Sequence, residues 1–391
     1  MKKNFIKKIY TKNFNDMINY GKQTITKIDK KSVLEALKSD YLTTGPKVKE
    51  FENKLIKKFG GKYCCVVNNG TSALLIVGKV LGWKKGDKII TTPLSFLATA
   101  NCIVQNNATP VFVDVENKTF TIDPQKLEDK LKKRHYKAVI AVDYGGHPCD
   151  WPSLRYLSKK YNFTLINDAC HSIGSKYKNN IKYACYYADY VTHSYHPVKA
   201  ITTGEGGSIF CKDKLIAEKI YKIRNHSMER NLRNEPWYYE IHEAGSNFRI
   251  TDFQCALGIS QLKNLGKFVD ARRKIASIYK KELKNDERFI LPLEKKHFFN
   301  AYHIFPLQIN FNSLNINKIE MYNKFKKKGI NLQVHYIPIH LQPFYRKKYN
   351  YKKNQFLNAE TFYKQEFSLP IYPTLKMTDL YKVIKELRTL K

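Results

Sequence analysis

From residue 63 onward, short apolar runs alternate with stretches of helical spacing, and this alternation restricts the possible fold more than any single motif. Buried strands separated by helices build a mostly parallel sheet that is covered on both faces. The pattern predicts an α/β fold that binds ligands at the carboxyl ends of its strands. Upstream, residues 32–60 predict two helices joined at LTTGP. The expected strands are YCCVVN (63–68), KIITTP (88–93), TPVFVDV (109–115), AVIAVDYGG (138–146), FTLINDA (163–169), YVTHSY (190–195) and GGSIFC (206–211).

The chain is long for a single hydrophobic core. Its 391 residues are expected to form a large and a small domain. After a helix near 251–264, the composition changes to a basic helical stretch followed by mixed α and β patterns. We expect a basic N-terminal extension over residues 1–16, a large cofactor-binding domain over 17–264 and a smaller C-terminal α+β domain over 265–391.

The formal net charge of +35 raises the question of an anionic partner. A field of this size can attract nucleic acid, anionic lipid or a phosphorylated substrate. The lysines, however, are spread along the whole chain in short runs, and arginine is scarce. No Cys/His finger, basic zipper or aromatic-glycine RNA motif is present. We therefore expect no nucleic-acid partner, and a basic nucleic-acid-binding protein is the distant alternative.

The cysteines and the apolar runs indicate the compartment. None of the eight cysteines forms a C-x-x-C pair, so we expect no metal site and mostly buried, reduced thiols. The basic N-terminus lacks the apolar core of a signal peptide, and no apolar run approaches the ~18 residues of a membrane span. These features predict a soluble cytoplasmic protein without a membrane partner.

One lysine stands in an unusual sequence context, SYHPVKAITTGEGG (194–207). A lysine becomes chemically special when its amine is neutral or bonded to an aldehyde. The glycines after Lys199 allow the backbone to approach a ligand closely, and Ser194 at a strand end can donate to a phosphate. An ordinary surface lysine is the alternative.

Three further features follow other strand ends. Asp168 ends FTLIND, where a buried carboxylate needs a partner such as a protonated ring nitrogen; a helix cap is the alternative. The segment NGTSA (69–73) places glycine and hydroxyls between a strand and a helix, as in an anion site, although a plain cap has the same pattern. Phe96 in TTPLSFLAT either packs in the core or covers a planar cofactor. Pyridoxal phosphate requires this combination of lysine, carboxylate, phosphate site and aromatic ring.

The motifs in their order along the chain resemble the DegT-type pyridoxal-phosphate-dependent sugar aminotransferases, from about Met17 to the C-terminus. That resemblance implies the fold-type-I aminotransferase architecture. The motifs are YLTTGP (41–46), NNGTSALL (68–75), TTPLSFLATANCI (91–103), TPVFVDV (109–115), INDACHSIGSKYKN (166–179), SYHPVKAITTGEGGSIF (194–210), RNHSM (224–228) and GSNFRITDFQCALGISQL (245–262).

The resemblance also implies roles around the cofactor ring. Lys199 would bond covalently to pyridoxal 5′-phosphate and then move the proton between substrate and cofactor. Asp168 would keep the pyridine nitrogen protonated, and His171 would lie near the phenolic oxygen. Phe96 would stack on the ring, where some relatives have tryptophan.

At the phosphate end, the resemblance assigns binding to Gly70, Thr71 and Ser194. Asn247 would reach the cofactor phosphate of a neighbouring subunit, so a homodimer would share its active sites. Cys170 departs from the family pattern, which has a small residue such as alanine or serine there. Some relatives have histidine in place of the lysine and catalyse dehydration, so Lys199 favours transamination.

The segments HPVKAITTGEGG, AVDYGGHP and QVHYIPI resemble most the C4 aminotransferases of pseudaminic acid biosynthesis. In that subgroup the substrate is a UDP-linked 4-keto-6-deoxy-N-acetylhexosamine and glutamate donates the amine. Enzymes for bacillosamine, legionaminic acid or perosamine share most of these motifs and are the alternatives. Candidate contacts to the nucleotide sugar are Thr43, Thr44, His226 and His335, with caps, turn bonds and core histidines as the alternative roles.

Overall fold

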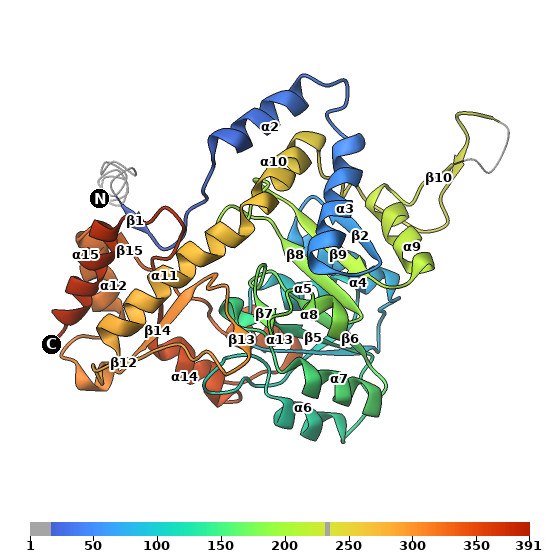
Figure 1. The fold of residues 1–391 in the computed structure, drawn as a ribbon. Helices are drawn as coiled ribbons and strands as arrows, with labels where there is room; N and C mark the ends of the chain where they lie inside the picture. The colour runs from blue at the N-terminus through green and yellow to red at the C-terminus, as the bar shows by residue number, and fades with distance from the viewer. Residues whose placement is uncertain (1–16, 231–234) are drawn as a thin grey trace, which may run out of the picture.

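The computed structural model describes residues 17–230 and 235–391 (Figure 1). The expected N-terminal extension, residues 1–16, lies outside the described residues. The centre of the described chain is a seven-stranded sheet with strand order β2-β9-β8-β6-β5-β3-β4. The strands are β2 (Tyr63–Val67), β3 (Lys88–Thr91), β4 (Thr109–Phe112), β5 (Ala138–Val142), β6 (Thr164–Asp168), β8 (Tyr190–Ser194) and β9 (Gly207–Cys211).

Each of these strands lies inside one of the apolar runs, so the predicted α/β fold is confirmed. From β8 across to β4 the strands run parallel. Only β9 of this sheet runs antiparallel to its neighbours, β8 and β2. The carboxyl ends of the parallel strands therefore meet at one edge of the sheet, where ligands bind in α/β folds.

Helices cover both faces of the sheet, as the near-continuous apolar character of its strands requires. One face packs against α3, α6, α7 and α10, and the other against α4, α5 and α9. The short α8 and the longer α9 were not among the expected helices. The helices of this region are α2 (Lys27–Leu37), α3 (Pro46–Phe59), α4 (Gly70–Val80), α5 (Ala98–Gln105), α6 (Pro124–Leu131), α7 (Trp151–Lys160), α8 (Tyr183–Tyr187), α9 (Lys214–Arg224) and α10 (Asp252–Lys263).

A second, smaller core lies in the C-terminal region, where an antiparallel sheet of order β12-β14-β16 packs against helices. The long helix α11 connects this region to the large sheet (Figure 1). The parallel pair β1–β15 adds the start of the described chain to this region. The elements are α11 (Leu265–Leu283), β12 (Phe289–Ile290), β14 (Phe305–Ile309), α12 (Lys318–Lys327), β15 (Ile330–Asn331), β16 (Glu366–Leu369), α15 (Met377–Arg388) and β1 (Ile18–Asn19).

Two other strand pairs and two helices complete the description. The hairpin of β10 (Glu229–Arg230) and β11 (Tyr239–Glu240) extends away from the sheet (Figure 1). The second pair joins β7 (Lys176–Tyr177) to β13 (Phe298–Phe299). Helices α13 (Pro343–Tyr349) and α14 (Leu357–Gln365) pack on the large domain through an aromatic cluster around Phe112.

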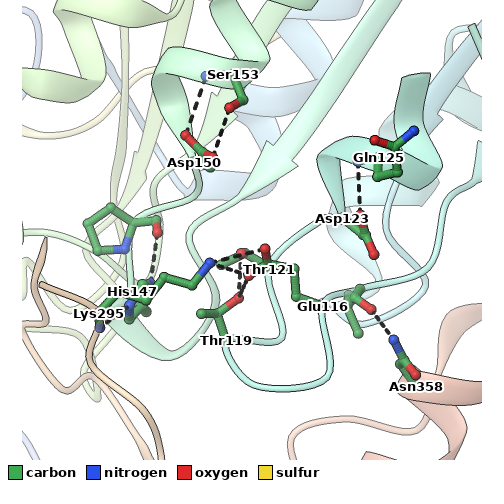
Figure 2. Close-up of polar contacts among 12 residues, drawn as sticks. Glu116, Thr119, Thr121, Asp123, Gln125, His147, Asp150, Ser153, Lys295 and Asn358 are labelled. Carbon is green, nitrogen blue, oxygen red and sulfur yellow. Dashed lines mark hydrogen bonds and ion pairs between the residues drawn. The ribbon is translucent and has the colours of Figure 1, made fainter.

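Polar contacts tie the C-terminal region to the edge of the large domain (Figure 2). Lys295 forms an ion pair with Glu116 at 2.8 Å. Asn358 Nδ2 donates to the carbonyl of Val115 at 2.7 Å. These contacts, together with the aromatic cluster, hold the C-terminal region against the large domain, so that residues 333–336 lie beside the carboxyl ends of the strands.

Candidate active site

A cavity of about 590 Å³ lies at the carboxyl ends of the parallel strands. Its wall comes from several segments that are distant in the sequence, including the start of α4, the end of β6 and the loop after β8. The predicted site residues that line it are Gly70, Thr71, Phe96, Asp168, His171, Ser194, Lys199 and His335.

Lys199 lies in the loop after β8, and its side chain is half-buried. Its Nζ is 3.4 Å from Nε2 of His303. Burial lowers the pKa of Lys199, and the neighbouring Cys170 and Asp168 offset part of this effect. An amine in this environment loses its proton more readily than a surface lysine, which is the condition for covalent chemistry with an aldehyde.

Asp168 is the last residue of β6 and is buried. Its Oδ2 accepts a hydrogen bond from Thr99 Oγ1 at 2.7 Å, and its Oδ1 accepts the backbone N–H of Cys170 at 3.2 Å. In the described chain the next helix begins only at Tyr183, so the helix-cap alternative for Asp168 is wrong. The carboxylate is instead held in place at the wall of the cavity.

The start of α4 forms another part of the cavity wall. Asn69 caps this helix by accepting the N–H of Ser72 at 2.8 Å, so the cap is present, and the anion site stays a prediction. A Cβ added at Gly70 would lie 2.8 Å from Cβ of Ser194, which shows how closely α4 approaches β8. The N–H groups of a helix start and the hydroxyls of Thr71 and Ser194 are suitable partners for a phosphate.

Phe96 and His171 line the same cavity, but Phe96 is exposed and His171 is buried. The Phe96 side chain is 55% exposed, so the core-packing alternative is wrong. His171 is buried, and its Nδ1 accepts the N–H of Gly145 at 3.3 Å. Burial lowers the pKa of His171 well below its usual value, so the ring is neutral and its Nε2 carries the proton. Tyr336 Oη lies 3.1 Å from that nitrogen and accepts its hydrogen.

The sequence reasoning missed several residues of the cavity wall. Tyr20, His303 and Tyr336 line it but come from segments far from the strand ends in sequence. Their positions depend on how the C-terminal region docks, and no local pattern marks them. Thr99 and Glu205 could have been found, because both lie in the motifs that contain Phe96 and Lys199.

Four predicted contact residues do not line this cavity. Thr43 pairs with Thr251 in an isolated bridge, and Thr44 Oγ1 bonds to the carbonyl of Thr43 at 2.7 Å. Asn247 is paired with Asn225 in another bridge. His226 is exposed and has a φ of 60°. In a single subunit these residues therefore lie apart from Lys199 and Asp168.

Arg272 of α11 is buried and fixes the loop that carries Lys199. Its guanidinium donates to the carbonyls of Val198 at 3.2 Å, His303 at 3.1 Å and Ile371 at 2.8 Å. Burial lowers the pKa of Arg272 to about 10. Because the side chain contacts both regions, it couples the position of the Lys199 loop to the docking of the C-terminal region.

The arrangement fits pyridoxal phosphate. The lysine amine and a fixed carboxylate line one cavity, which also reaches a helix start that suits a phosphate. The DegT/DnrJ/EryC1/StrS aminotransferase family model matches residues 23–388. The chain belongs to this family. It is a pyridoxal-phosphate-dependent sugar aminotransferase with the fold-type-I architecture.

Individual relatives cover nearly the whole chain. An uncharacterised protein of Methanocaldococcus jannaschii is 40% identical over 361 residues, 91% of this chain and 93% of its own. The UDP-4-amino-4,6-dideoxy-N-acetyl-β-L-altrosamine transaminase of Campylobacter jejuni (strain 81-176) is 37% identical over 372 residues, 95% of this chain and 96% of its own. The structure of Helicobacter pylori PseC, an aminotransferase involved in the biosynthesis of pseudoaminic acid, aligns with a TM-score of 0.87 at 33% identity, covering 95% of this chain and 98% of that one.

The described residues include no helix with the length and apolar character needed to cross a membrane. In residues 17–230 and 235–391, no cluster of three or more His, Cys, Asp or Glu side chains is placed to hold a metal ion.

Proposed function

We propose that this aminotransferase moves an amino group from glutamate to C4 of a UDP-linked 4-keto-6-deoxy-N-acetylhexosamine, in the biosynthesis of pseudaminic acid. The similarity to the Campylobacter jejuni transaminase over 95% of this chain supports that substrate. The similarity to the GDP-perosamine synthase of Escherichia coli O157:H7, at 31% identity over 90% of this chain, leaves other nucleotide keto sugars as alternatives. These are the substrates of bacillosamine, legionaminic acid and perosamine enzymes.

The observation that carries the proposal is the shared cavity of Lys199 and Asp168. When bound, pyridoxal phosphate supplies an electron sink and carries the amino group between substrates. Lys199 would hold the cofactor covalently, and after its release the Nζ amine would accept and return the substrate proton. The lowered pKa of Lys199, caused by burial, favours that role. The Asp168 carboxylate would accept a hydrogen bond from the ring nitrogen and keep that nitrogen protonated.

The other predicted residues orient the cofactor. We assign the phosphate to Gly70, Thr71 and Ser194, which line the same cavity; the close approach of Gly70 to Ser194 supports this role. Phe96, in its exposed position, would cover one face of the ring. Neutral His171 would lie next to the phenolic oxygen.

We further propose a homodimer with shared active sites. Helix α2 exposes Ile28, Leu34 and Leu37 to solvent in a single subunit, at 62%, 58% and 49%. Leu34 and Leu37 lie one turn apart on the same face of the helix, and exposed apolar side chains placed together in this way are typical of an interface. In this arrangement Asn247 reaches the phosphate of the neighbouring cofactor. Thr43, Thr44 and His226 of one subunit would contact the sugar bound in the neighbouring subunit. His335 would contact the sugar bound in the cavity of its own subunit.

A substrate panel tests the proposal. The purified protein, reconstituted with pyridoxal phosphate, is incubated with glutamate and one of several UDP- or GDP-linked 4-keto sugars, and products are identified by mass spectrometry. We expect the UDP-linked N-acetylhexosamine to be converted to an amino sugar, with 2-oxoglutarate formed from glutamate in equal amount. The Lys199→Ala variant should form neither product. Amination of a GDP-linked sugar alone, or loss of water instead of amination, would contradict the proposal.

A further inference from the structure

A chain of buried polar side chains runs from the C-terminal region to the cavity. Glu366 and Ser368 lie on β16, and both are 0% exposed. Ser368 Oγ is 2.5 Å from Oε1 of Glu366 and 2.8 Å from Nδ1 of His335. His335 itself lines the cavity. The three side chains therefore connect a buried carboxylate to the sugar site by two consecutive hydrogen bonds.

The direction of these hydrogen bonds follows from the donors available. Oε2 of Glu366 accepts the backbone N–H of His335 at 3.0 Å, and a backbone N–H can only donate. The short distance from Ser368 Oγ to Oε1 is typical of a hydroxyl that donates to an ionised carboxylate. Burial raises the pKa of Glu366 to about 8, while its hydrogen bonds with Ser368 and the backbone N–H of His335 and the charge of Lys318 lower it. Above that pKa the carboxylate is ionised and can only accept from Ser368.

Ser368 has a single proton, which its hydroxyl donates to Glu366. Its oxygen is then free to accept from His335, so Nδ1 of His335 carries a hydrogen. Burial lowers the pKa of His335 to about 3, and the ring is neutral at physiological pH. A neutral imidazole has only one N–H, so Nε2 of His335 has a lone pair. Across residues 17–230 and 235–391, no protein group forms a hydrogen bond with this nitrogen.

We propose that Glu366 and Ser368 are positioning residues that fix this tautomer, so that His335 accepts a hydrogen bond from a hydroxyl or an acetamido N–H of the bound sugar. This inference rests on the proposed nucleotide-sugar substrate. It also assigns the contact. A keto oxygen can only accept, so a sugar that presented its carbonyl here would leave two acceptors unpaired. His335 therefore selects a donor at a position other than the reacting carbonyl carbon.

The first test measures the tautomer directly, without any sugar. In the holoenzyme labelled with ¹⁵N-histidine, the ring-nitrogen shifts are assigned with His335→Gln. We expect a protonated Nδ1 and an unprotonated Nε2 at pH 9, above the pKa of Glu366. A protonated Nε2 in the unsubstituted protein would overturn the proposal.

The Glu366→Gln variant gives a more specific prediction, because the backbone fixes the orientation of the glutamine amide. The backbone N–H of His335 still requires the amide oxygen, so the amide NH₂ must donate to Ser368. The serine hydroxyl then donates to Nδ1, and the proton of His335 moves to Nε2. An unchanged tautomer in Glu366→Gln, or in Ser368→Ala, would refute the relay.

A kinetic test separates the relay from the proposed function. With the UDP-linked 4-keto-6-deoxy-N-acetylhexosamine at pH 9, Glu366→Gln should raise the sugar KM about tenfold or more and leave the KM for glutamate unchanged. Glu360→Gln is the matched control. Glu360 Oε1 lies 3.0 Å from Nε2 of another buried histidine, His340, and neither residue lines the cavity. An equal rise in KM in both variants would contradict the relay. If no nucleotide sugar is turned over, the proposed function fails, whereas the NMR measurement still decides the tautomer.

Discussion

At the residue scale, the chemistry of the site depends on burial more than on pairing of opposite charges. Lys199 has its hydrogen-bond contact with a neutral histidine rather than with a carboxylate, in the part of the chain that the structure describes. Burial lowers the pKa of both Lys199 and His303. Arg272, whose positive charge also lowers the pKa of Lys199, holds the loop by carbonyl contacts alone. The wall of the cavity therefore favours a reactive amine.

A pH dependence of stability follows from another buried histidine, His193. It packs edge-on against Phe59 and Phe210, and its Nδ1 has no hydrogen-bond partner. Burial lowers the pKa of His193 to about 3, against about 6.5 in an unfolded chain. Between these values the unfolded state binds more protons, so stability falls as the pH decreases. At pH 5 the loss from this group is about 2 kcal/mol.

His193→Leu removes that titration. We expect urea unfolding of the variant to depend less on pH between 7 and 5, by about one bound proton. Tyr195→Phe, which removes a buried hydroxyl bonded to Ser208, is the control and should lower stability without changing the pH slope. An unchanged slope in His193→Leu would contradict the assignment of a neutral buried ring.

At the element scale, the approach of α4 to β8 determines whether the phosphate end can form. Gly70→Ala places a methyl group 2.8 Å from Cβ of Ser194, and the helix must move away from the strand. We expect the affinity for pyridoxal phosphate to fall about 10- to 100-fold, measured by absorbance titration of the apoprotein. Gly266→Ala on α11 is the control, because nothing lies within 4 Å of its added Cβ. Equal affinities of the Gly70→Ala and Gly266→Ala variants would contradict the assigned phosphate site.

The sequence predicts the elements that carry the cofactor better than those that carry the sugar. Asp168 and Ser194 could be assigned because each ends an apolar strand, and the strands are readable from local pattern. Tyr20 could not, because its place depends on the pairing of β1 with β15, more than 300 residues away in sequence. His335 was predicted as a contact residue, yet its link to Glu366 depends on long-range packing of β16.

At the scale of the whole molecule, the exposed apolar side chains of α2 favour a dimer over a single subunit. Leu34 and Leu37 show the spacing of a buried helix face, but the structure leaves both exposed. In the proposed homodimer, a second copy of the chain would cover this face and bring Asn247 to the neighbouring site.

The double substitution Leu34→Asp and Leu37→Asp tests this arrangement. We expect a monomer by sedimentation velocity, together with weaker binding of pyridoxal phosphate, because charged side chains disfavour an apolar interface. Ile319→Asp is the control, because Ile319 is 74% exposed on α12 and far from α2 in sequence. A dimer that survives the double substitution would exclude this interface.

The proposed bond between Lys199 and pyridoxal phosphate can be trapped chemically and located in the sequence. The purified protein is reduced with borohydride, digested and analysed by mass spectrometry. The account predicts a single modified lysine, Lys199, in the peptide that follows β8, and no stable modification in Lys199→Ala, whose circular dichroism should be unchanged. A phosphopyridoxyl group on any other lysine, or an unmodified Lys199 in protein that shows the cofactor absorbance, would contradict the account.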